Sequence, residues 1–251
     1  MPTFAVILAA AGQSTRFGDK HYKKPFAPLA NKPVWLYSAE RFINRAEVAQ
    51  TILVVAPEDR AAFGDKFLGS AAMLGIEVVD GGAERADSVQ RALERVRKEI
   101  DFVAVHDAAR PCLAEAWIDE VFAAAVKGGA AILALPIRGT IKRATKHKDQ
   151  AYASITETIP RDGLWEAQTP QVMRRDWLVE AYAKRGGFNA TDEAQLLERV
   201  GKSVALVPGS PINLKITTKE DLKLAEHSLK ALPQPKLNNA MNPFSDDDQW
   251  R

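Results

Sequence analysis

The chain lacks several features that would assign it to a protein class at once. It has one cysteine, Cys112, so no disulfide within the chain and no cysteine-based metal site can form. No apolar run approaches the roughly 20 residues that a membrane-spanning helix requires. Neither sign of charge dominates, because 34 Lys and Arg stand against 32 Asp and Glu. These absences argue against a nucleic-acid or membrane partner and favour a reducing, cytoplasmic setting.

The composition is otherwise that of an ordinary globular protein. Hydrophobic residues make up 46% of the 251 residues, which suffices to bury a full core without cross-links. The apolar start at residues 4–11 imitates a short signal peptide, but no Lys or Arg precedes it and a glycine-containing loop follows directly. We therefore interpret this start as a buried strand.

Short apolar runs alternate with amphipathic stretches along most of the chain. The runs predict strands that are covered on both faces, and the stretches carry apolar residues at helical spacing. This alternation predicts an α/β fold with a mostly parallel sheet and helices on both faces. The predicted strands are residues 4–10, 51–56, 76–79, 102–106, 130–135 and 204–207, and the predicted helices are 33–45, 88–100, 116–126, 176–184, 192–200 and 219–231.

Residues 138–162 interrupt this alternation with basic side chains and short β-prone pieces. The segment is too long for a plain connection, so we interpret it as a projecting β-arm. An isolated β-ribbon needs a partner surface, which predicts a homodimer joined through the arm. A loose basic loop is the alternative. Residues 1–232 are predicted to form one domain, and residues 233–251, rich in Pro, Asn and Asp, are predicted to be a disordered tail.

Ligands of open α/β sheets bind where the strands end, which draws attention first to the loop at residues 11–24. Small residues around Gly12 let the backbone approach a ligand, and successive N–H groups there can bind an anion. Arg16 and Lys24 add a planar and a compact cation, which suits a triphosphate. The spacing from Gly12 to Gly18 does not fit a P-loop, and no G-x-G-x-x-G pattern is present. A solvated glycine turn is the alternative.

The second loop, residues 80–88, joins a predicted strand to a predicted helix. Gly81 and Gly82 permit close backbone approach, and the free N–H groups of the helix start can bind phosphate. Asp87 or Ser88 is expected to be the N-cap of that helix, which does not exclude a nucleotide on the same loop.

The third loop, residues 106–112, follows another buried strand. Asp107 falls at the carboxyl end of that strand and suits Mg²⁺, which is usually held by one or two carboxylates together with substrate phosphates. Arg110 would hold a second phosphate. His106 points to the opposite face of the strand from Asp107, so we interpret it as a packed, hydrogen-bonded residue. Cys112 is interpreted as a small packing residue.

Two further polar positions stand near the end of the chain. Thr191 has the character of an N-cap, followed by Asp192 and Glu193 in the first helical turn. Lys215 has an apolar neighbour on each side in a predicted short strand. For a lone lysine the default expectation is a solvated side chain.

These clusters, in this order, resemble the 2-C-methyl-D-erythritol 4-phosphate cytidylyltransferase family. The resemblance runs from about residue 4 to residue 229, nearly the whole predicted domain. One glycine-containing loop would be a weak signal, whereas four segments in register are specific. The four segments are residues 80–88, 106–112, 164–171 with Thr169-Pro170-Gln171, and 213–217.

The resemblance implies a Rossmann-like nucleotidyltransferase fold, a homodimer joined by the β-arm, and transfer of CMP from CTP to the methylerythritol phosphate with release of pyrophosphate. Catalytic roles are implied for Arg16, Lys24 and Lys215. The nucleotide would be bound by Ala10, Ala11, Gly12, Gly82, Arg85 and Ser88. Mg²⁺, or another hard divalent cation, would be bound by Asp107. The acceptor would be bound by Asp107, Arg110, Thr140, Arg161 and Thr191, with Thr140 and Arg161 coming from the partner's arm.

The sequence departs from the family pattern at two places and leaves other functions open. The family usually has Pro-Lys-Gln where this chain has Lys23-Lys24-Pro25, so Lys23 is an alternative to Lys24. Gly139 replaces an acidic residue that is common in the arm. Another acceptor, such as ribitol 5-phosphate, a purine-nucleotide transferase and a non-catalytic CTP-binding module are the competing interpretations. A nucleic-acid binder would need interleaved aromatics, of which the basic arm has only Tyr152.

Overall fold

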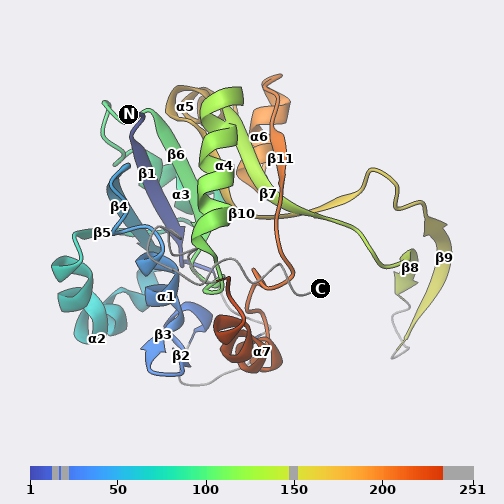
Figure 1. Cartoon of the computed structure of the whole chain (residues 1–251), viewed down its shortest axis with the longest axis horizontal. Coiled ribbons are helices and arrows are strands. Elements are labelled where there is room, and N and C mark those ends of the chain that lie inside the picture. Colours follow the sequence, from blue (N-terminus) through green and yellow to red (C-terminus); the bar gives the residue numbers. More distant parts are fainter. Residues whose placement is uncertain (13–16, 18–22, 147–151, 234–251) are drawn as a thin grey trace, which may run out of the picture.

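The computed structural model describes residues 1–12, 17, 23–146 and 152–233 of the chain. Figure 1 shows a central sheet with helices on both faces and a separate β-ribbon. Within the described residues the sheet has seven strands in the order β11-β7-β10-β6-β1-β4-β5. Their bounds are β1 Phe4–Ala9, β4 Val48–Val55, β5 Ile76–Asp80, β6 Phe102–Asp107, β7 Ala130–Pro136, β10 Trp165–Arg174 and β11 Ala205–Pro208.

The sheet is mostly parallel, as the sequence predicts. Strand β1 pairs in parallel with β4 and with β6, β4 pairs in parallel with β5, and β7 does so with β11. The exception is β10, which lies antiparallel between β6 and β7. Because Gln171 of β10 pairs with Val105 of β6, the motif segment that precedes Gln171 lies beside the carboxyl end of β6.

The helices cover both faces of the sheet. On one face, α1, α2 and α4 pack against Val6, Leu8 and Leu53, and on the other, α3, α5 and α6 pack against Ile7 and Val54. Alternate residues of β1 thus enter two apolar cores, the pattern of a strand covered on both sides. The helices are α1 Val34–Glu40, α2 Arg60–Met73, α3 Arg85–Leu93, α4 Glu115–Gly128, α5 Arg175–Ala183, α6 Glu193–Arg199 and α7 Lys219–Lys230, with short 3-10 turns η1 Lys24–Phe26 and η2 Pro57–Asp59.

The starts of two helices differ from the sequence predictions. Helix α3 begins at Arg85, with Glu84 as its N-cap, and the carboxylate of Asp87 accepts the N–H of Glu84 at 3.1 Å. The prediction that Asp87 or Ser88 is the N-cap was therefore wrong. Glutamate is an unusual N-cap, and the sequence pattern Glu84 to Asp87 is not one of the usual capping-box signatures. The N-cap of α6 is Asp192 rather than Thr191.

The ends of the helices also depend on local hydrogen bonding. Helix α1 ends at Glu40 and α3 at Leu93, earlier than predicted, because tighter turns follow both. Helix α7 begins with a capping box, in which the Thr218 hydroxyl accepts the N–H of Asp221 at 3.2 Å. None of the helices in the described ranges is long and apolar enough to cross a membrane.

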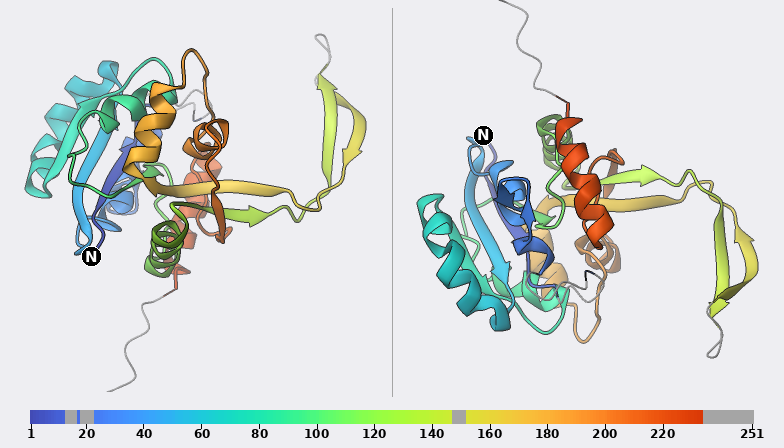
Figure 2. Two further views of the ribbon diagram at one scale, coloured as in Figure 1. Left: turned by 90° about the horizontal axis from the view of Figure 1, so that it is seen from above. Right: turned by 90° about the horizontal axis from the view of Figure 1, so that it is seen from below.

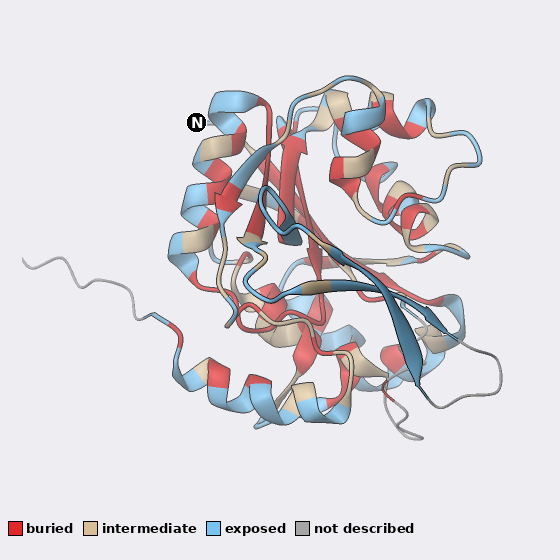
Figure 3. Cartoon of the chain, turned by 90° about the vertical axis from the view of Figure 1, so that its right-hand side faces the viewer, coloured by how far each residue is buried: buried red, intermediate tan, exposed pale blue. Residues whose placement is uncertain are grey.

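Residues 138–162 contain a two-stranded antiparallel ribbon, β8 Ile141–Lys146 and β9 Ala153–Ile159. Both views of Figure 2 show this ribbon standing away from the main body. Nearly all of its described residues are exposed on both faces, as Figure 3 shows. Residues 147–151, between β8 and β9 in the sequence, and the predicted tail beyond Pro233 lie outside the described residues. A small hairpin, β2 Pro28–Leu29 with β3 Lys32–Pro33, lies near α7.

Candidate active site

A pocket of about 330 Å³ opens at the carboxyl ends of the parallel strands. The loop after β1, the loop between β5 and α3, and the last residue of β6 all contribute to its wall. Loops at this edge of an open sheet form the usual ligand site. The sequence-predicted residues that line the pocket are Ala11, Gly12, Lys24, Gly82, Arg85, Ser88, Asp107 and Lys215.

The loop between β5 and α3 folds tightly around one buried hydroxyl. The Ser88 hydroxyl accepts the N–H of Gly82 at 3.0 Å and donates to the carbonyl of Glu84 at 3.0 Å. A Cβ at Gly82 would lie 2.4 Å from the Cβ of Asp87, a separation that atoms do not tolerate. This close packing requires glycine and brings the backbone itself to the surface of the pocket.

Asp107 is the buried carboxylate at the base of this pocket. Its Oδ2 lies 2.7 Å from Nζ of Lys215 and 3.6 Å from Nε of Arg110, and its Oδ1 lies 3.8 Å from Nε of Arg85. Burial alone would raise the pKa of Asp107, but the cations Lys215, Arg85 and Arg110 hold it well below its usual range. The carboxylate is therefore ionised, and Lys215 is paired with it in the pocket rather than being a lone solvated lysine.

His106 is fully buried beside Asp107 but faces away from the pocket. The carbonyl of Arg110 lies 3.1 Å from its Nε2, and the hydroxyl of Thr169 lies 3.1 Å from its Nδ1. Because a carbonyl only accepts, Nε2 carries the proton and Nδ1 accepts from Thr169. Burial lowers the pKa of His106 to about 4, so the ring is neutral. These contacts agree with the packed, hydrogen-bonded role expected from the sequence.

Glu193, which does not line the pocket, forms an ion pair with the guanidinium of Arg85. Its two terminal nitrogens donate to the two carboxylate oxygens of Glu193 at 2.8 and 2.9 Å, and the Tyr182 hydroxyl lies 3.3 Å from the same carboxylate. Burial alone would lower the pKa of Arg85, but Glu193 and Asp107 raise it above its ordinary value. Arg85 is thus a permanently charged side chain fixed between two carboxylates.

The structure separates the two neighbouring lysines of the first loop. Lys24 lines the pocket, whereas Nζ of Lys23 lies 2.8 Å from Asp59 and 3.0 Å from Glu58 in η2. Burial alone would lower the pKa of Lys23, but these two carboxylates raise it above the ordinary value. Lys23 is therefore committed to an ion pair outside the pocket.

Several predicted site residues are not brought to the pocket. Ala10 is buried in the core and its N–H donates to β4, because successive residues of an extended segment face opposite sides. Thr191 is exposed and hydrogen-bonds to the side chain of Gln195 in α6. Thr140 and Arg161 lie on the exposed arm, where Arg161 donates to the carbonyl of Arg138. Arg16 lies outside the described residues.

Sequence reasoning missed the buried polar residues that hold the pocket together. The Thr169 hydroxyl accepts the N–H of Asp107 at 3.0 Å, and the Asn213 amide donates to the carbonyl of Thr169 at 2.9 Å. The backbone carbonyl of Asn213 in turn accepts a hydrogen bond from Arg110 at 2.7 Å. Thr169 and Asn213 belong to two of the four motif segments, and that membership was the available signal. Glu193 carried no such signal, because an acidic residue in a first helical turn is ordinary.

The donor set fits a hard divalent cation held together with substrate phosphates. Within the described ranges, no group of three or more His, Cys, Asp and Glu side chains could bind a metal ion alone. Asp107 supplies one ionised oxygen ligand, and the single cysteine of the chain does not compete, because Cys112 is buried with its thiol toward the Ala225 carbonyl. Mg²⁺ typically binds in this way, through one or two carboxylates with phosphates and water.

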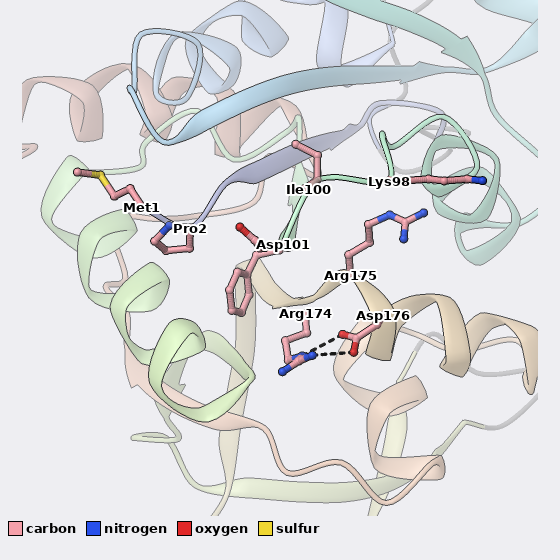
Figure 4. Close-up of a pocket in the computed structure, with 9 residues that line it drawn as sticks. Met1, Pro2, Lys98, Ile100, Asp101, Arg174, Arg175 and Asp176 are labelled. Carbon is pink, nitrogen blue, oxygen red and sulfur yellow. Dashed lines mark hydrogen bonds and ion pairs between the residues drawn. The ribbon is translucent and has the colours of Figure 1, made fainter.

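A larger hollow of about 490 Å³ lies at the opposite edge of the sheet, where β6 begins and β10 ends. Figure 4 shows its wall, formed by the N-terminal segment, the loop before β6 and the start of α5. Arg174 and Asp176 pair with each other there at 2.8 Å, and Asp101 accepts the N–H and hydroxyl of Thr3. None of the described residues that line this hollow belongs to a loop at the carboxyl ends of the parallel strands, so its size does not make it the candidate site.

Comparison with known proteins extends the pattern over the whole body of the chain. The sequence profile of the family described as IspD, 2-C-methyl-D-erythritol 4-phosphate cytidylyltransferase, matches residues 4–231. A protein of that name from Rhodopirellula baltica is 42% identical over 233 residues, which cover 88% of this chain and 93% of the relative. The structure of the Thermus thermophilus enzyme of that name is 30% identical, with a TM-score of 0.74, over 92% of this chain and 100% of the other. The Francisella tularensis structure is 30% identical, with a TM-score of 0.74, over 91% and 100%.

Proposed function

The chain belongs to the 2-C-methyl-D-erythritol 4-phosphate cytidylyltransferase family, and we propose that the pocket at Asp107 is where it carries out that reaction. The enzyme is a nucleotidyltransferase of isoprenoid precursor biosynthesis. It transfers CMP from CTP to 2-C-methyl-D-erythritol 4-phosphate and releases pyrophosphate.

The chemistry asks for positioning and charge stabilisation rather than proton transfer. A phosphate monoester has a second pKa near 6, so the acceptor is largely a dianion at neutral pH and needs no general base. One of its oxygens forms a bond to the α-phosphorus of CTP while the bond to the bridging oxygen of the β-phosphate breaks. The leaving pyrophosphate takes that electron pair. This requirement agrees with a pocket that is rich in cations and with a neighbouring His106 that faces away from it.

Each charged side chain has a role that follows from its position. The backbone at Gly12 and Gly82, with Ser88, would hold the cytidine and its phosphates. Lys24 and Lys215 would stabilise the charge that develops during transfer, with Arg16 from the same first loop as Lys24. Arg110 would face the acceptor phosphate, as the family resemblance implies, next to Asp107, from which its Nε lies 3.6 Å.

The bound cation is also part of the proposal. Asp107 would hold Mg²⁺ together with the triphosphate, and the cation would supply charge neutralisation on the phosphates. Lys215, whose amine pairs with Asp107 in this structure, would then face the phosphates. The chain's own contribution is to keep Asp107 ionised and fixed through Thr169 and Arg110.

The exposed ribbon supports a homodimer in which the arm of one subunit completes the site of the other. A two-stranded ribbon is marginal alone, and Tyr152 and Ile155 leave about two thirds of their surfaces exposed, at 67% and 66%. In such a dimer, Thr140 and Arg161 would reach the acceptor in the partner's pocket. We further propose that residues 1–232 act as one domain and that the enzyme works in the cytoplasm, where its charged substrates are retained.

The observation that carries the proposal is the convergence of Lys24, Arg85 and Lys215 on the pocket around one ionised carboxylate, Asp107. The test is pyrophosphate release by the purified protein with CTP and Mg²⁺, comparing methylerythritol 4-phosphate with ribitol 5-phosphate. Release with the first acceptor alone is expected. Release with ribitol 5-phosphate alone would reassign the acceptor, and no release with either would leave a CTP-binding module. Replacing CTP with GTP or ATP tests the purine alternative.

A further inference from the structure

Glu193 is a fully buried carboxylate that the reaction itself does not use. It lies in the first turn of α6 with 1% of its surface exposed, and it does not line the pocket. Both of its oxygens accept hydrogen bonds from Arg85 of α3, at 2.8 and 2.9 Å. A two-pronged pair of this kind restrains the plane of the guanidinium as well as its position.

The sheet holds Glu193 in place. The side-chain oxygen of Gln171 in β10 accepts the N–H groups of Glu193 and Ala194 at 3.1 and 3.0 Å, and its amide donates to Asp192 at 2.9 Å. The start of α6 is thereby tied to the strand that borders β6. The Tyr182 hydroxyl, 3.3 Å from the carboxylate, closes the remaining side. The position of Glu193 is therefore set independently of any bound nucleotide.

This arrangement decides which part of Arg85 reaches the pocket. Both terminal nitrogens point to Glu193, so the group nearest to Asp107 is Nε, 3.8 Å from Oδ1. That separation is too long for a hydrogen bond. Arg85 therefore lies near Asp107 without forming a hydrogen bond to it. A guanidinium in the same place that Glu193 did not bind would form the same two-pronged pair with Asp107.

We propose that Glu193 is a positioning residue of the active site: it withholds the Arg85 guanidinium from Asp107, so that this carboxylate stays available to the divalent cation that binds with CTP. The inference rests on the proposed function in one respect, namely that Asp107 is the cation ligand. It assigns Arg85 the part of a fixed cation at the edge of the pocket rather than that of a mobile phosphate clamp.

The test removes the charge of Glu193 and measures cation binding without turnover. In Glu193→Gln, Arg85 loses its partner and the nearest remaining carboxylate is Asp107. Mn²⁺ binding in the presence of CTP, without acceptor and followed by electron paramagnetic resonance, is expected to weaken about 10-fold or more, the usual range for residues that act through a metal ligand. Unchanged Mn²⁺ affinity in a folded Glu193→Gln protein overturns the proposal.

A double variant separates positioning from mere structural support. In Arg85→Gln with Glu193→Gln, the competing cation is gone and two neutral amides occupy the buried site. Because Arg85 also lines the nucleotide pocket, CTP is held at a concentration that saturates each variant, and the proposal then expects Mn²⁺ affinity to return toward that of the unchanged protein. If Glu193 only supports the fold, the double variant binds Mn²⁺ at least as weakly as the single one, and that result overturns the proposal.

Two further variants keep the test decisive. Glu193→Asp retains the buried charge and its fold but is too short to reach both nitrogens of Arg85, so an intermediate Mn²⁺ affinity is expected, and an unchanged one counts against the proposal. Glu180→Gln removes a surface carboxylate of α5 that pairs with Lys184 and Lys202, and it serves as the matched control. Failure of the unchanged protein to release pyrophosphate would reject the proposed function, whereas the Mn²⁺ measurements test Glu193 alone.

Discussion

The amine of Lys215 lies 2.7 Å from the carboxylate of Asp107, and the two residues come from segments far apart in the sequence. Asp107 ends β6, and Lys215 lies two residues after the buried Asn213. The side-chain amide of Asn213 donates to the carbonyl of Thr169, and its backbone carbonyl accepts a hydrogen bond from Arg110. The ion pair therefore joins motif segments that a chain of buried hydrogen bonds already holds together. It places a cation and a carboxylate where phosphates would enter.

Replacing Lys215 tests its catalytic role. Lys215→Ala is expected to lower kcat by roughly 10²–10³, because a preorganised charge that stabilises a transition state is typically worth that factor. Pyrophosphate release at saturating CTP and Mg²⁺ measures it. Lys202, which pairs with Glu180 on the surface, provides the control variant Lys202→Ala. A Lys215→Ala enzyme with nearly full kcat would remove this residue from the mechanism.

The two lysines of the first loop are expected to behave differently. Lys24→Gln should lower kcat by roughly 10²–10³, as expected for a charge in the pocket. Lys23→Gln should change kcat by less than about 5-fold, because a partly exposed ion pair contributes only about 0–1 kcal/mol. Parallel measurements of pyrophosphate release compare them. A larger loss for Lys23 than for Lys24 would reverse the assignment.

Two glycine substitutions are expected to have opposite effects on stability. Gly82→Ala should lower the free energy of unfolding by about 1–3 kcal/mol, because its Cβ would lie 2.4 Å from that of Asp87. Gly64→Ala in α2 meets nothing within 4 Å and should raise it by about 0.5–1 kcal/mol, the helical advantage of alanine. Urea denaturation measures both. Equal effects of the two substitutions would contradict the close packing of the Gly82 loop.

The stability of the protein should fall on mild acidification because of His106. Burial lowers its pKa from 6.5 to about 4, so between these values the unfolded chain binds a proton that the folded chain does not. Stability therefore decreases as the pH falls through this window, by about 2 kcal/mol between pH 7 and pH 5. Urea denaturation at both values measures the loss. In His106→Gln, whose amide can bond Thr169 and Arg110, that loss should shrink, and an unchanged loss would place its origin elsewhere.

A mixing experiment tests the shared site of the proposed dimer. Arg161→Ala and Lys215→Ala subunits should each be nearly inactive alone. Unfolding and refolding them together in equal amounts should restore about a quarter of the unchanged activity, because half of the dimers pair one subunit of each kind and each such dimer has one intact site. Pyrophosphate release measures the recovery. Absence of recovery, with dimers verified by sedimentation, would mean that Arg161 serves its own subunit's pocket or none.

Local patterns in the sequence predicted much of the fold. The apolar runs that became β1, β4, β5, β6, β7 and β11 are recognisable because a strand buried on both faces must be apolar almost throughout. The N-cap at Thr218 is readable because its partner, Asp221, lies three residues away. The loops of the pocket followed from the general rule that ligands bind at the carboxyl ends of parallel strands.

What local patterns in the sequence determined is thus the α/β class and the position of the pocket, since these depend on neighbours along the chain, whereas most of the residues that line the pocket were implied by the family resemblance. The tertiary structure alone decided that Glu193 holds Arg85, that Lys215 meets Asp107 and that Lys23 turns to Asp59 instead of the pocket. The partners in these pairs lie on different elements, and no local spacing specifies their distance. Only the tertiary packing of these elements, α6 against β10 of the sheet among them, brings the charges together.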